Sequence, residues 1–290
     1  STQSLEQKII YSELLEQYIK YRVAIIENGN HKTELKNTIK LAEKMCDADP
    51  ESWEKKLLLI YFRLIDGNIP GAEEYLDDVR EEVMKNRLAN NRAYCFFLCI
   101  RALYNESEEQ LDTASKLIMK YYSENGQDPM LMLMLMRTDS SVRENQSLSV
   151  LRLKELFLGG FRSPLLYLEA CENYRKAPDL LRVLNDFELQ CLHFGARWGI
   201  LSEDLAINAA RVSSFENTFN TFTLKMLENI YDKYPRRQIL ENICSYLLRC
   251  DRKASEYFKW FDRGVRKELN IVGLYEAYIE SLPENFDKPL

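Results

Sequence analysis

The sequence predicts an all-α protein, an α-solenoid of antiparallel helix pairs. Four segments, around Pro50, Pro129, Pro164 and Pro235, have the same pattern. Each begins with an apolar helical stretch, continues with a few polar residues and a proline, and ends with a second apolar stretch. Successive prolines lie 79, 35 and 71 positions apart, which corresponds to two, one and two units of about 35 to 40 residues. Only 10 glycines and 8 prolines interrupt stretches rich in Leu, Glu, Lys and Ala, a composition typical of helices.

Each proline is expected to open a helix, because its missing N–H group would be unpaired in the first turn anyway, and an Asp or Ser before it can cap the free amides. A single unit of this kind cannot bury its apolar face alone, so neighbouring units must stack. We therefore predict one helical-repeat domain over residues 1–290. The polar stretch 137–146 is the expected place for a hinge or a subdomain boundary.

The first half is predicted to begin with a helix over residues 4–28, followed by a helix pair on either side of Pro50. A strongly acidic helix up to about residue 88 comes next, and Ser107 stands three residues before Gln110, as in a capping box. The apolar faces of the pair around Pro50 consist of Leu35, Ile39, Ala42 and Cys46 before it, and Trp53, Leu57, Ile60, Tyr61, Leu64 and Ile65 after it.

The run from Met130 to Met136 is apolar at every position, so its period does not distinguish a strand from a buried helix. The preceding Asp128-Pro129 favours a helix. Alternating Met and Leu side chains also suit an adaptable binding groove, although a buried core is the simpler expectation.

In the second half, the clearest predicted pair consists of the two helices on either side of Pro235. The first presents Phe219, Phe222, Met226, Leu227, Ile230, Tyr231 and Tyr234 on one face, and the second presents Ile239, Leu240, Ile243, Cys244, Leu247 and Leu248. Gly195 and Gly199, four positions apart, indicate close helix packing.

The net charge and the cysteine content of the chain indicate where in the cell the protein is expected and which classes of partner are disfavoured. The net charge of −6 and the pI near 5.3 disfavour nucleic acid as a partner. No run approaches 18 apolar residues, so membrane insertion is not expected. The 7 cysteines are odd in number and scattered, which is typical of reduced thiols and predicts a cytoplasmic location, unless an export signal lies upstream of Ser1.

No catalytic residue, cofactor site or metal site is predicted. Cys95 and Cys99 share a helix face and have the spacing of half a zinc site, but zinc needs two further ligands, and neither His31 nor His193 has ligand spacing with them. A Cys–His nucleophile remains an alternative that residue types alone do not decide.

A protein or peptide partner is predicted instead, on the aromatic and basic helix near residue 260. Trp, Tyr and Arg dominate the energetics of protein interfaces, and the alternative is that about half of these side chains are core. The predicted partner-binding residues are Tyr257, Trp260, Arg263, Arg266 and Lys267.

Residues 195–283 resemble a family of large bacterial proteins, known as a domain of unknown function, chiefly from Gram-positive anaerobes of the gut. The stretches that carry this resemblance are GARWGILSEDL (195–205), ICSYLLRCD (243–251), LYEAY (274–278) and SLP (281–283). The resemblance implies a fragment of a much longer protein. The first half resembles tetratricopeptide-type repeats in its Leu-Ala…Asp-Pro order (41–50), although it lacks the regular small residues of that family. This resemblance implies a right-handed superhelix.

The function expected from these features is that of a non-catalytic scaffold or protein–protein interaction module within a larger bacterial protein. One alternative is the helical accessory domain of an enzyme whose active site lies outside residues 1–290. A second is the recognition of a carbohydrate or nucleotide in a groove between helices.

Overall fold

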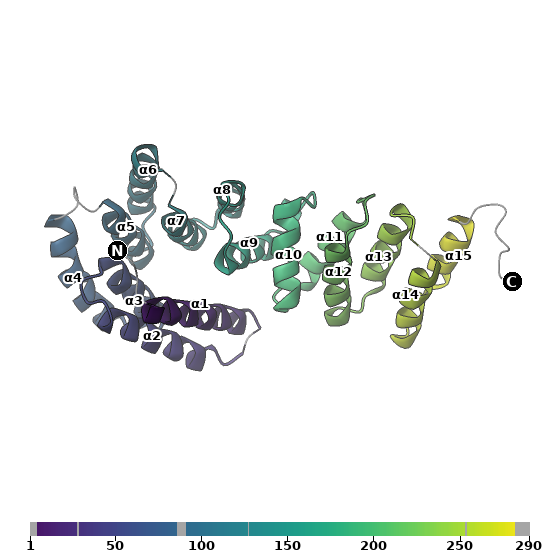
Figure 1. The fold of residues 1–290 in the computed structure, drawn as a ribbon, viewed down its shortest axis with the longest axis horizontal. Helices are drawn as coiled ribbons and strands as arrows, with labels where there is room; N and C mark the ends of the chain where they lie inside the picture. Colours follow the sequence, from purple (N-terminus) through teal and green to yellow (C-terminus); the bar gives the residue numbers. More distant parts are fainter. Residues whose placement is uncertain (1–4, 28, 86–90, 127, 253, 282–290) are drawn as a thin grey trace. The chain divides into compact units, whose positions relative to one another are not determined.

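The computed structural model describes residues 5–27, 29–85, 91–126, 128–252 and 254–281. Within these ranges the chain forms α-helices joined by short connections, with one 3-10 helix and no strand (Figure 1). Contacts group the chain into two compact units, Ser1–Glu169 (unit 1) and Ala170–Leu290 (unit 2). From α1 to α8 and from α11 to α14, helices that follow one another along the chain pack together, which confirms the predicted all-α solenoid of helix pairs.

Unit 1 contains eight complete described helices and the first turns of a ninth. They are α1 (Leu5–Ile26), α2 (His31–Asp47), α3 (Trp53–Ile65), α4 (Ile69–Lys85), α5 (Asn91–Asn105), α6 (Glu108–Asn125), α7 (Pro129–Val142), α8 (Gln146–Leu158) and α9 (Pro164–Lys176). The predicted end of the acidic helix near residue 88 lies outside the described residues, as do residues 282 and 283 of the family resemblance.

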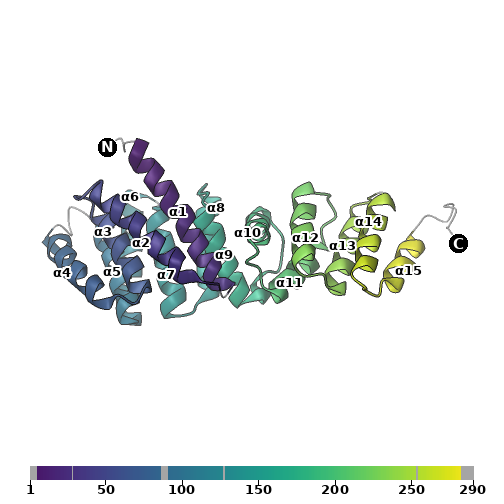
Figure 2. The ribbon, with the colours of Figure 1, turned by 90° about the horizontal axis from the view of Figure 1, so that it is seen from below.

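The helices of unit 1 alternate between two layers. Besides packing on its sequence neighbours, α5 packs on both α3 and α7, so these odd-numbered helices form one layer. They begin at Trp53, Asn91 and Pro129, at intervals of 38 residues, which is within the predicted 35 to 40. The first helix, α1, packs along α2, and its C-terminal end lies next to α9 (Figure 2).

Two helix starts in unit 1 confirm the predicted caps. Asp128 accepts a hydrogen bond through Oδ1 from the backbone N–H of Leu131 at 3.1 Å, with Pro129 as the first residue of α7. Ser107 Oγ accepts one from the N–H of Gln110 at 3.3 Å, but the reciprocal half of the predicted capping box is absent there, because Gln110 Oε1 accepts from Asn105 and the Ser107 N–H donates to Ala102.

The predicted position of the prolines is right for Pro129 and Pro164, which begin α7 and α9, but not for the other two. Pro50 and Pro235 lie in the turns before α3 and α13 (Arg237–Arg249). Proline suits a turn equally well, because its fixed φ and the restriction on the residue before it both end the preceding helix.

The two units divide at another place than the stretch 137–146, and the hinge or boundary expected there stays a prediction. Residues 137–142 belong to α7, and the division between the units falls at Glu169 within α9. Three polar residues of the stretch, Thr138, Asp139 and Ser140, are buried, and two of them contact α8: Asp139 lies 3.6 Å from Arg152, and Ser140 hydrogen-bonds Ser149 at 3.0 Å. Because these polar groups have partners, they can be buried within a helix. Motion about the stretch remains a prediction.

Unit 2 continues the helix pairs from the second half of α9. It contains a 3-10 turn (Pro178–Leu180), α10 (Asp186–Arg197), α11 (Glu203–Ser213), α12 (Thr221–Lys233), α13, α14 (Ala254–Arg266) and α15 (Val272–Ser281). Alternate helices pack on one another, α10 on α12 and α11 on α13, so the unit has two layers.

A register of 34 or 35 residues relates the helices of each layer in unit 2. Every buried residue of α11 has a buried counterpart 34 positions later in α13, from Leu205 and Ile239 to Ser213 and Leu247. The other layer consists of α10, α12 and α14, where equivalent residues lie 35 positions apart from α10 to α12 and 34 from α12 to α14. Four such positions are buried in all three helices: Glu188, Thr223 and Tyr257; Cys191, Met226 and Trp260; Leu192, Leu227 and Phe261; and Gly195, Ile230 and Gly264. The predicted faces of α12 and α13 are confirmed at Met226, Leu227, Ile230 and Tyr231, and at Ile239, Leu240, Ile243, Cys244 and Leu247.

Gly195 confirms the predicted close packing. A Cβ atom at this position would lie 2.8 Å from Sγ of Cys171 and closer still to Leu201, which is too near for two unbonded atoms. Gly199 has another role: it follows α10 with φ +68°, a left-handed conformation that glycine adopts without a steric penalty.

Candidate functional site

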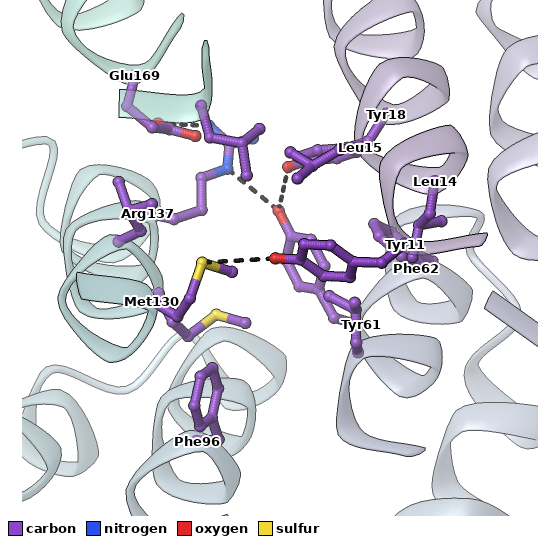
Figure 3. Close-up of a pocket in the computed structure, with 14 residues that line it drawn as sticks. Tyr11, Leu14, Leu15, Tyr18, Tyr61, Phe62, Phe96, Met130, Arg137 and Glu169 are labelled. Atoms are coloured by element: carbon purple, nitrogen blue, oxygen red, sulfur yellow. Dashed lines mark hydrogen bonds and ion pairs between the residues drawn. The ribbon is translucent and has the colours of Figure 1, made fainter. Parts of the chain in front are cut away.

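A largely apolar pocket opens in unit 1, with about 660 Å³ of empty space including the part open to solvent (Figure 3). Its walls come from five alternate helices, α1, α3, α5, α7 and α9. The pocket therefore lies on the layer of odd-numbered helices, where α1 approaches α3 and α7.

The rim of the pocket consists of half-buried apolar side chains from all five helices, together with the exposed ring of Tyr11. Aromatic and sulfur-containing groups face one another here, and the Tyr11 hydroxyl donates a hydrogen bond to Sδ of Met130 at 3.7 Å. The rim residues are Tyr11, Leu15, Leu58, Phe96, Met130 and Leu165. Unbranched methionine side chains adapt to differently shaped guests, which suits this rim to binding.

A buried polar network closes the inner end of the pocket. Arg22 Nη1 donates to Glu169 Oε1 at 2.7 Å and to the Tyr18 hydroxyl at 2.9 Å, and the two phenolic oxygens of Tyr18 and Tyr61 lie 3.0 Å apart. Arg137 donates from Nε to the Tyr61 hydroxyl at 3.2 Å, and its Nη1 lies 4.0 Å from Glu169. Two guanidinium groups and one carboxylate thus meet among α1, α3, α7 and α9.

The groups of this network are arranged to hold the helices together. Burial raises the pKa of Tyr18 well above its ordinary value of 10, while the charge of Arg22 acts in the opposite direction, so the phenol stays protonated at neutral pH. The Glu169 carboxylate is bonded to Arg22, which is only 2 % exposed. A carboxylate held in this way stabilises the packing of α1 on α9.

The predicted partner-binding residues of unit 2 divide into core and surface. Tyr257 and Trp260 are buried, and the Trp260 ring packs edge-on against Tyr231 of α12 with 5.5 Å between the ring centroids. Arg266 and Lys267 are exposed, and Arg266 pairs with Asp262 at 2.8 Å.

Arg263 lies between these two groups. Its guanidinium stacks over the Trp260 ring at 4.3 Å from the centroid and pairs with Asp232 of α12. The aromatic side chains of the predicted site therefore hold α14 on α12. The part of the predicted site that a partner can reach consists of Arg263, Arg266 and Lys267.

The cysteines of the chain carry thiols and form no disulfide, and most of them are buried. Burial raises the pKa of Cys95 to about 11 and that of Cys99 further, so both thiols stay protonated at neutral pH and neither is activated as a nucleophile. Among the described residues, no three His, Cys, Asp or Glu side chains gather as they would around a metal ion. In the same part of the chain, no helix combines the length and the hydrophobicity needed to cross a membrane.

Sequence reasoning missed the pocket and its polar network. One signal was present in the alternation of Met and Leu at 130–136, which allowed either a core or a groove. Both occur, since Leu131, Leu135 and Met136 are buried in the core while Met130, Leu133 and Met134 line the pocket.

The comparisons with known proteins give a family for the whole chain. Residues 1–290 match the family model described as "Family of unknown function (DUF5717)N-terminal". No curated protein and no solved structure matches the chain.

Proposed function

The chain belongs to the DUF5717 family, as its N-terminal region, and from this premise we propose that it is a non-catalytic protein-binding module of a larger protein. The observation that carries the proposal is the pocket of unit 1. We propose that it receives an apolar anchor side chain, aromatic or long aliphatic, from a peptide segment of a protein partner.

The chemistry of the pocket supports an apolar guest. Aromatic, leucine and methionine side chains form its accessible wall, and the charged groups at the inner end already bond one another. Filling such a pocket removes apolar surface from water on both partners, at about 25 cal/mol per Å². Anchors of this kind dominate the affinity of many protein interfaces.

The same wall disfavours a sugar or a nucleotide. The hydroxyl groups of a sugar would leave water for a surface of Leu15, Leu58, Phe96 and Leu165, where no replacement hydrogen bonds are offered. An unsatisfied polar group of this type costs about 1–3 kcal/mol. Phosphate would face Glu169 as well as the arginines.

Several finer features belong to this proposal. The 34- and 35-residue register of unit 2 supports a tetratricopeptide-like scaffold, since repeats of that type have about 34 residues. Cysteines that form no disulfide support a reducing, cytoplasmic location. We place the module in a large bacterial protein, in which its repeats present the pocket to a partner.

Panning a random peptide library displayed on phage against the immobilised protein tests the proposal. We expect enriched peptides to share one aromatic or long aliphatic position. The variant Leu165→Trp adds volume at the rim of the pocket and should abolish this enrichment.

Leu158→Trp is the matched control, because Leu158 is an exposed side chain of α8 outside the pocket. This variant should enrich the same peptides as the unmodified protein. Enrichment that survives Leu165→Trp, or the absence of any shared apolar position, would refute the proposal. Unchanged helical circular dichroism in both variants shows that the fold is intact.

A further inference from the structure

The register of unit 2 shows which surfaces a following repeat covers. In α12, Tyr231 is 1 % exposed because Trp260 and Arg263 of α14 lie on it. Its counterpart 34 positions later is Val265 of α14, which is 58 % exposed. One apolar position of the repeat is therefore buried in α12 and open to solvent in α14.

The other layer shows the same change from buried to exposed. Leu240 of α13 is 0 % exposed, and a Cβ on Gly264 would lie 2.7 Å from its Cδ2, so α14 covers it directly. The helix α15 begins 35 positions after α13, and at this interval Leu240 corresponds to Tyr275, which is 36 % exposed.

These positions form one continuous surface on the last two helices. Phe258 and Val265, seven residues apart, share a face of α14, and the Tyr275 ring lies 6.5 Å from that of Phe258. Val272 begins α15 and is also exposed. We name Phe258, Val265, Val272 and Tyr275 the terminal face.

We propose that the terminal face binds the first helix of a further 34- to 35-residue repeat, contributed by the same protein from the C-terminal side of this region. The new helix would lie on α14 and α15 as α14 lies on α12 and α13. The family description supports this source, since it assigns residues 1–290 to the N-terminal part of its proteins.

The register also predicts which residue types the first helix of the further repeat has on its buried face. The three existing helices of its layer are α10, α12 and α14. The position of Trp260 in α14 is Cys, Met or Trp in these helices, that of Phe261 is Leu or Phe, and that of Gly264 is Gly or Ile. A helix of this pattern places an apolar ridge on Tyr275 and Val265 and brings its backbone close where glycine occurs. Stacking repeats in this way buries the face that the last repeat otherwise exposes to water.

Cysteine labelling in the full-length protein tests the proposal. Val272→Cys probes the terminal face, and Val183→Cys is a matched control at the start of unit 2, where valine is 53 % exposed compared with 62 % for Val272. Alkylation by iodoacetamide is followed at each site by peptide mass spectrometry. We expect the thiol introduced by Val272→Cys to react at least about tenfold more slowly than the control thiol in the native protein, and at the same rate in urea.

A photo-crosslinking residue at position 275 identifies the occupant. We expect a crosslink within one polypeptide, to a helical segment on the C-terminal side of residue 290. Equal labelling rates in the Val272→Cys and Val183→Cys variants, or a crosslink to a second copy or another protein, would overturn the proposal. It is independent of the pocket in unit 1, so each proposal can fail alone.

Discussion

Arg22 and Glu169 form a buried ion pair at 2.7 Å, although 147 positions of sequence separate them. The pair joins the first helix of unit 1 to the last, and the same guanidinium holds Tyr18, whose phenol contacts Tyr61 of α3. The inner end of the pocket is thus built from residues that are remote in sequence, and its shape depends on α1 staying in place.

Removing one member of this pair should be far more harmful than removing both. We expect Glu169→Leu to lower the free energy of unfolding by about 3–5 kcal/mol, because Arg22 is then left buried with its charge uncompensated. The double variant Arg22→Met, Glu169→Leu should recover most of that loss. Urea denaturation followed by helical circular dichroism measures both, and equal losses in the two variants would contradict the account.

A methyl group at Gly195 should destabilise unit 2. We expect Gly195→Ala to cost about 1–3 kcal/mol, since its Cβ would overlap Leu201 and Cys171 in a packed interior. Gly273→Ala is the control, because the nearest atom to its Cβ is the flexible end of Arg237 at 3.8 Å. There alanine should be neutral or add up to about 1 kcal/mol through its helix propensity. Thermal melts of the two variants should therefore shift in opposite directions or by clearly different amounts.

The predicted partner-binding helix should separate into structural and surface residues on mutation. We expect Trp260→Ala to cost about 3–5 kcal/mol, because the ring is buried against Tyr231. Arg266→Ala should change stability by less than about 0.5 kcal/mol, as its side chain is largely exposed. If Trp260→Ala melted like the unmodified protein, α14 would not pack as described. Only variants at Arg266 and Lys267 test partner binding without altering the core.

Stability should fall in mild acid because of His193. Its ring stacks on Phe222 with 3.6 Å between centroids, and burial lowers its pKa, with Arg197 and Lys225 acting in the same direction. The folded protein therefore binds this proton less well than the unfolded chain, whose histidine titrates near pH 6.5. The free energy of unfolding should be constant above this range and decline as the pH falls through 6.5 toward the lower folded pKa.

The variant His193→Gln should lack this component. We propose measuring urea unfolding between about pH 8 and pH 5 for both proteins and subtracting the curves. A difference that grows as the pH falls supports the assignment. Parallel curves would show that another group causes any acid sensitivity.

Residue periodicity predicted the helices and their buried faces well, because both depend on local sequence. The faces of α12 and α13 follow directly from apolar residues spaced three and four apart. The pocket depends instead on which distant helix covers each face. Tyr11 meets Met130 across 119 positions, and a helical period carries no information about such pairs.

The aromatic and basic residues near Trp260 show a second limit. Tryptophan and arginine are typical both of interfaces and of the packing between repeats, so composition did not separate the two roles. The stacking of Arg263 on Trp260 serves packing within unit 2. The polar stretch 137–146 shows a related limit, because polarity did not reveal that Asp139 lies buried in α7 and pairs with Arg152 of α8.

The constant spacing in unit 2 has a consequence for how such proteins change length. Adding or deleting one complete period of 34 residues leaves every inward side chain opposite the kind of neighbour it already fits, as Leu205 and Ile239 do. A change of one or two residues within a helix would instead rotate the apolar side chains away from their neighbours. Gain or loss of one whole unit therefore requires no new kind of interface between neighbouring helices.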